Sequence, residues 1–108
     1  MFVLKANPTF RAKVKLPVPG ADSQAIEFVF RHKRRSELKA FADDAIRRED
    51  MDVIMDVVEG WSGVSGEDGA VVPFSRDAVA RLVEEFPAAG AAIVAAYIRE
   101  LTDARVGN

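Results

Sequence analysis

Strict alternation of apolar and basic residues from Phe10 to Leu16 constrains the fold of this chain more than any other feature. The apolar positions are Phe10, Ala12, Val14 and Leu16, and the basic positions are Arg11, Lys13 and Lys15. A period of two sends successive side chains to opposite faces of an extended chain. The segment is therefore predicted to be a half-buried β-strand with a basic outer face.

A second strand is predicted after a turn. Pro17, Pro19 and Gly20 end the first strand, because proline cannot donate to a β-ladder and the Pro-Gly pair favours a turn. Ile26, Phe28 and Phe30 then repeat the period of two. The two strands should form an antiparallel β-ribbon over about residues 8–32. An isolated ribbon is marginal in water, so its apolar face must pack on helices or on another chain.

The remainder of the chain has helical periodicity. A first helix is expected near 36–49 with Ser36 as its N-cap, and a second carries Met51, Ile54, Met55, Val58 and Trp61 on one stripe. A third runs from Asp77 to Phe86 with Ser75 as its N-cap, and the last spans about Pro87 to Ala104. The high valine content of 53–58 leaves a strand as a minor alternative there.

Together these patterns predict one α+β domain over residues 1–108. A two-stranded antiparallel β-ribbon would pack on a bundle of three to four α-helices that occupies about residues 36–105. At this length the buried fraction of the surface is modest, so self-association into a homo-oligomer remains open.

Charge is distributed unevenly along the chain. Residues 1–35 hold eight basic against two acidic side chains, whereas the remainder holds seven against fifteen. The candidate basic patch comprises Arg11, Lys13, Lys15, Arg31, Lys33, Arg34 and Arg35. Such a patch can bind nucleic acid, but it can also attract the acidic part of the same or another chain. The net charge of −2 argues against nucleic acid as the main partner.

The sequence predicts no catalytic residue, no metal site and no cofactor. It contains no cysteine and one histidine, His32, whose neighbours are basic rather than nucleophilic or carboxylate groups. The apolar part of the N-terminus is too short for a signal peptide, and the apolar stretch 88–98 is too short to cross a bilayer. A cytoplasmic protein without membrane contact is expected.

Several motifs occur in an order that resembles a known family. They are the two-stranded start, the Gly60-Trp61 turn, the helix start Val72-Pro73-Phe74-Ser75 and a closing helix rich in alanine, isoleucine and tyrosine. This arrangement resembles the small phage tail assembly chaperones of tailed bacteriophages and prophages. The resemblance implies a non-catalytic, prophage-encoded protein of the host cytoplasm, with the tape measure protein and tail tube protein as partners.

A chaperone of this kind needs a surface that holds apolar helical segments weakly. The candidate partner-binding residues are Met51, Met55, Trp61, Ile93 and Tyr97, together with the small-residue face of the last helix. Trp61 can alternatively be a core residue at a helix end. The competing functions are a small nucleic-acid-binding or regulatory protein that uses the basic strand face, and a structural tail component that stays in the virion.

Overall fold

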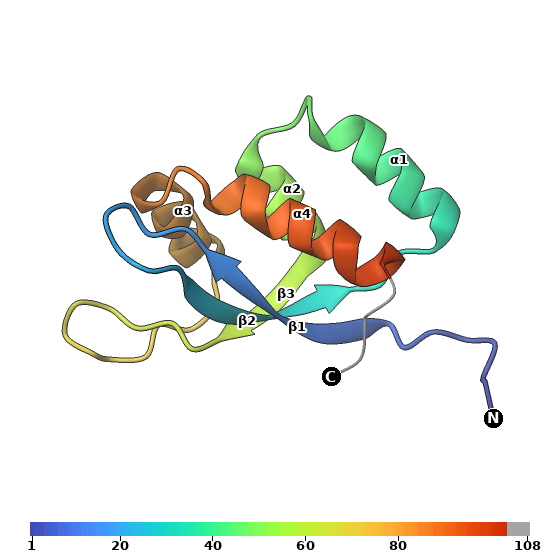
Figure 1. The fold of residues 1–108 in the computed structure, drawn as a ribbon, viewed down its shortest axis with the longest axis horizontal. Coiled ribbons are helices and arrows are strands. Elements are labelled where there is room, and N and C mark those ends of the chain that lie inside the picture. The colour runs from blue at the N-terminus through green and yellow to red at the C-terminus, as the bar shows by residue number, and fades with distance from the viewer. Residues whose placement is uncertain (104–108) are drawn as a thin grey trace.

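A three-stranded antiparallel sheet with helices on one face forms the protein (Figure 1). The computed structural model describes residues 1–103. Its elements in chain order are β1 Thr9–Leu16, β2 Gln24–Arg31, α1 Arg35–Ala45, α2 Asp50–Val57, β3 Val58–Ser62, α3 Arg76–Glu85 and α4 Ala89–Thr102. No helix within residues 1–103 covers the other face of the sheet in Figure 1. Within residues 1–103 no helix combines the length and the apolar character that spanning a membrane requires.

The ribbon predicted at the N-terminus is confirmed. β1 and β2 pair antiparallel in a register that runs from Thr9 opposite Arg31 to Leu16 opposite Gln24. The alternating apolar and polar side chains also point to opposite faces of the sheet, as predicted. The side chains of Ala12, Val14, Leu16, Ile26, Phe28 and Phe30 are buried under the helices, whereas Arg11, Lys13 and Lys15 point to solvent.

The number of strands and the end of the second helix differ from the prediction. α2 ends at Val57, and the next residues form β3, which pairs antiparallel with β2. Trp61 therefore lies on a strand opposite Phe28, not on a helical stripe. Two successive β-branched valines, Val57 and Val58, followed by Gly60 favour an extended chain, and the open edge of β2 supplies its partners. The α+β class is correct, but the sheet has three strands rather than two.

The helix boundaries agree with the sequence in part. Ser75 caps α3 as predicted, because its hydroxyl oxygen accepts a hydrogen bond from the Ala78 N–H at 3.0 Å. Ser36 does not cap α1. The helix begins at Arg35, and the N-cap position is held by Arg34, two residues before Ser36. The Glu37 carboxylate accepts from the Arg34 N–H at 2.8 Å. α1 ends at Ala45 rather than near residue 49, and α4 begins at Ala89 rather than at Pro87. The end predicted for the last helix, at residue 104, lies outside the described residues.

Tyr97 of α4 ties the last helix to the sheet. Its ring lies among those of Phe10, Phe30 and Phe41, with centroids 5.1 to 6.1 Å away. Its hydroxyl donates to the Arg31 carbonyl oxygen at 2.6 Å. Burial, with smaller contributions from Asp56 and Glu37, raises the pKa of Tyr97 to about 12.

Replacing Tyr97 with phenylalanine should lower the free energy of unfolding by about 1–2 kcal/mol, because the Arg31 carbonyl loses its buried donor. The pKa of Tyr97 is raised in the folded state, so its contribution is complete below pH 10.0 and is lost as the pH rises towards about 12. Urea unfolding of both proteins across this range tests the prediction. A stability difference that stays constant above pH 10.0 would contradict it.

Candidate functional site

The structure does not bring the five candidate partner-binding residues to one surface. The side chains of Ile93 and Tyr97 have no exposed area and lie in the core, so they have no surface to offer a partner. Met51 and Met55 of α2 are half-buried. Ile93 and Tyr97 were predicted from their place on an apolar stripe, and the structure buries that stripe against the sheet. We therefore assign these two residues to the core.

Trp61 is held in place by contacts within the chain. Its indole Nε1 donates to the Val72 carbonyl oxygen at 2.9 Å. Its ring makes edge contacts with Phe28 and Phe74, at centroid distances of 6.3 and 5.4 Å. Trp61 thus fastens the segment 63–75 to the sheet, as a core residue would. Part of its surface remains exposed and lines a hollow beside α3.

An open groove of about 450 Å³ separates α1 from α4. Small and aliphatic side chains line most of it, namely Ala42, Ala45 and Ile46 on the α1 side and Ala91, Val94, Ala95 and Ile98 on α4. We call it the α1–α4 groove. A second hollow shares Ile46, Arg48 and Asp50 with it and extends to Met51. The small-residue face of α4, noted in the sequence, is the signal that points to this groove.

The helix α1 forms one wall of this groove and is attached to the rest of the protein over a small area. Phe41 is its one buried residue, and Leu38 and Ala45 pack partly against the core. The Lys33 ammonium lies 5.5 Å from the centre of the Phe41 ring. Just after the helix, the Ile46 side chain is 89 % exposed. The groove therefore presents uncovered apolar surface beside a lightly packed helix.

The predicted basic patch divides into two parts. Arg11, Lys13 and Lys15 lie on the outer face of β1, where Arg11 pairs with Glu27 of β2 at 3.3 Å. Arg31, Lys33 and Arg34 also pair with carboxylates of this chain, which are Glu59 at 3.5 Å, Asp56 at 3.3 Å and Glu37 at 3.4 Å, respectively. Arg35 is exposed at the start of α1. Because these basic side chains pair with carboxylates of the same chain, the patch offers a nucleic acid less positive charge than its number of lysines and arginines indicates.

Asp56 of α2 joins the segments just before and just after α1 through its charge. Its carboxylate accepts from Arg48 at 3.0 Å and from Lys33 at 3.3 Å. Burial raises the pKa of Asp56, but these two cations outweigh that effect and hold it below its ordinary value. Asp56 is thus a structural ion-pair centre. Within residues 1–103, no group of three or more histidine or carboxylate side chains is placed to hold a metal ion.

Comparison with known proteins gives one match that covers the whole chain. The family model for phage tail assembly chaperones matches residues 1–108. No curated protein and no solved structure matches the chain. The match extends through the sheet, which includes Trp61 of β3, and all the helices that line the α1–α4 groove. The chain therefore belongs to the phage tail assembly chaperone family.

Proposed function

We propose that this tail assembly chaperone binds the tape measure protein, keeps it soluble and assists assembly of the tail tube around it. The observation that carries the proposal is the family match over residues 1–108. The protein would act without catalysis in the cytoplasm of a bacterial host that carries the prophage. Tail tube subunits would be its second partner, and it would leave before the tail is complete.

The α1–α4 groove is the surface that fits such a client best. Its alanines would let the backbone of an apolar helical segment approach closely, while Val94, Ile98 and Ile46 would supply contact area. Met51, at the end of the adjoining hollow, could adapt to varied client side chains. Contact over so small an area would be weak, which suits a chaperone that must release its client.

Co-expression with the tape measure protein tests this proposal. The wild-type chaperone should raise the soluble fraction of the client, and the double substitution Ala91→Glu/Ala95→Glu should remove most of that gain. Both alanines are exposed on α4, so two carboxylates there should disturb client contact more than folding. Ala80→Glu, at an exposed position of α3 outside the groove, is the matched control.

The outcomes separate the function from the surface. A wild-type chaperone that leaves the tape measure protein insoluble would contradict the function. A double variant that matches wild type would place the client elsewhere and leave the function standing. Finding the protein in purified virions would favour the structural tail component instead.

A further inference from the structure

An exposed apolar arm precedes the sheet. Residues 1–7, which we call the N-terminal arm, run away from the domain beyond the start of β1 (Figure 1). The side chains of Phe2, Val3 and Leu4 are 87 %, 74 % and 96 % exposed. Three consecutive large apolar side chains without cover are uncommon on a soluble protein and mark a contact surface.

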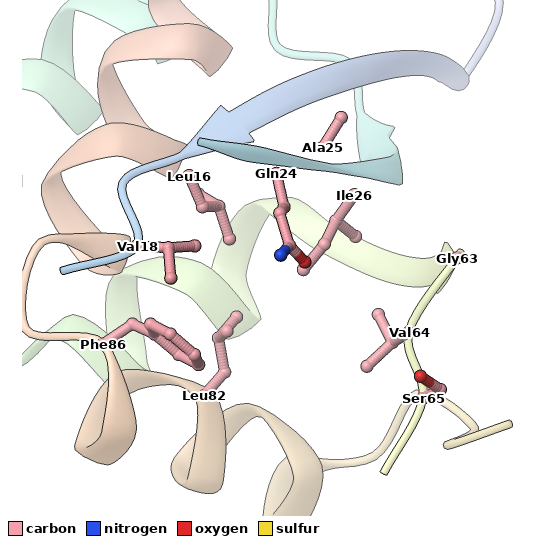
Figure 2. A pocket seen from close by; sticks show the side chains of 10 residues that line it. All are labelled: Leu16, Val18, Gln24, Ala25, Ile26, Gly63, Val64, Ser65, Leu82 and Phe86. Carbon is pink, nitrogen blue, oxygen red and sulfur yellow. The ribbon is translucent and has the colours of Figure 1, made fainter. Parts of the chain in front are cut away.

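A groove that could receive such an arm lies at the other end of the molecule. It runs between the end of the β1–β2 hairpin, the segment after β3 and α3, and we call it the α3 groove. Figure 2 shows Val18, Ile26, Val64 and Leu82 pointing into it from these separate segments. Its two hollows, of about 190 and 300 Å³, share Val64, Ser65, Leu82 and Phe86 as walls and therefore adjoin each other.

The arm of a molecule cannot fill the α3 groove of the same molecule. The His32 N–H donates to the Pro8 carbonyl oxygen at 2.9 Å and fixes the base of the arm beside the far end of β2. Phe2 is six residues from Pro8, so it reaches at most about 21 Å from there. β1 carries the chain from Pro8 to Leu16, where the groove begins, over about 26 Å.

Charge favours a second copy of this chain as the occupant. The arm carries Lys5, and the strand that follows it presents Lys13 and Lys15 on its outer face. The outer part of the α3 groove is bordered by Glu67 and Glu85, with one basic side chain, Arg81, beside them. The basic first third of one copy would thus face the acidic part of the next.

We propose that the N-terminal arm of one copy docks into the α3 groove of another. The two surfaces differ, so the contact is head-to-tail and can continue from copy to copy. The arm buries few side chains, and the association should therefore be weak and concentration-dependent.

Complementary variants test this proposal. In sedimentation analysis the mean mass of the wild-type protein should rise with concentration. The arm variant Phe2→Asp/Leu4→Asp and the groove variant Val64→Asp should each remain monomeric. A mixture of the two should form dimers and nothing larger, because one intact groove can receive one intact arm. Ile46→Asp, at an equally exposed aliphatic residue outside both surfaces, should associate like wild type.

Trp61 provides a second measurement that needs no groove variant. It lines the α3 groove, so a synthetic peptide of residues 1–7 should shift the tryptophan emission of the arm variant in a saturable way. A wild-type protein that stays monomeric, an arm variant that still associates, or a peptide without effect would overturn the proposal. None of these outcomes bears on tape measure binding through the α1–α4 groove.

Discussion

Replacing Phe30 with alanine is expected to lower the free energy of unfolding by about 3–5 kcal/mol. Phe30 has no exposed area and lies where β1, β2, β3 and α4 meet. Its ring is 5.5 Å from Phe10, 5.6 Å from Phe28 and 5.1 Å from Tyr97, and it lies opposite Val58 of β3. Truncation removes the central ring of this cluster, and the surrounding strands and helix cannot all move in to fill the space.

Such a loss is large for a domain of this size, whose total stability is of the order of 5–15 kcal/mol. Urea unfolding followed by circular dichroism measures it. Val29→Ala is the matched control, because Val29 lies next to Phe30 on the same strand but on the outer face. It should cost less than about 1 kcal/mol. Equal losses in the two variants would mean that the helices do not pack on the Phe30 face.

The N-terminal strands could be predicted from the sequence because both are half-buried and regular. Alternating apolar residues define the period of two without help from the rest of the chain. The turn between them is equally local, since Pro17 and Pro19 lack the N–H that would continue a ladder. The Ser75 cap could be found for the same reason, because its hydrogen bond to Ala78 spans only three residues.

β3 could not be placed in this way, although the valines of 53–58 left a strand open as a minor alternative near its start. Met51, Ile54, Met55, Val58 and Trp61 satisfy helical spacing, yet the helix stops at Val57. The chain becomes extended because β2 presents an unpaired edge and Phe28 a ring for Trp61 to contact. Both partners lie about thirty residues earlier in the sequence, and a local pattern holds no information about them. Ile93 and Tyr97 were also chosen from a local pattern, which does not say what covers the apolar stripe of α4.

The two grooves are also products of tertiary structure. The apolar face of α4 could be found from its alanines, but whether another element covers it depends on where α1 packs. Phe41 is the one buried residue of α1, so the helix stands beside α4 without covering Val94 and Ala95. The α3 groove combines Val18, Val64 and Leu82, which lie in three separate segments.

Replacing Trp61 with alanine should be nearly as destabilising as Phe30→Ala, at about 3 kcal/mol. The change removes the ring contacts with Phe28 and Phe74 and leaves the Val72 carbonyl without its donor. Trp61→Phe keeps much of the ring and loses the hydrogen bond, so it should cost about 1 kcal/mol. Chemical unfolding followed by circular dichroism measures both. Amide exchange in residues 63–75 should quicken most in the alanine variant, since this segment loses its attachment to β3.

The phenylalanine variant also separates the two interpretations of Trp61. As a core residue, Trp61 acts through the fold, so Trp61→Phe should keep the tape measure protein as soluble as wild type does. As an anchor for the client, it would present its indole to the partner, and Trp61→Phe would reduce client solubility although the chaperone stays folded. The hydrogen bond from Nε1 to Val72 is made within the chain, and it uses the one polar group of the indole. This internal hydrogen bond favours the core interpretation and agrees with our proposal that the client binds in the α1–α4 groove.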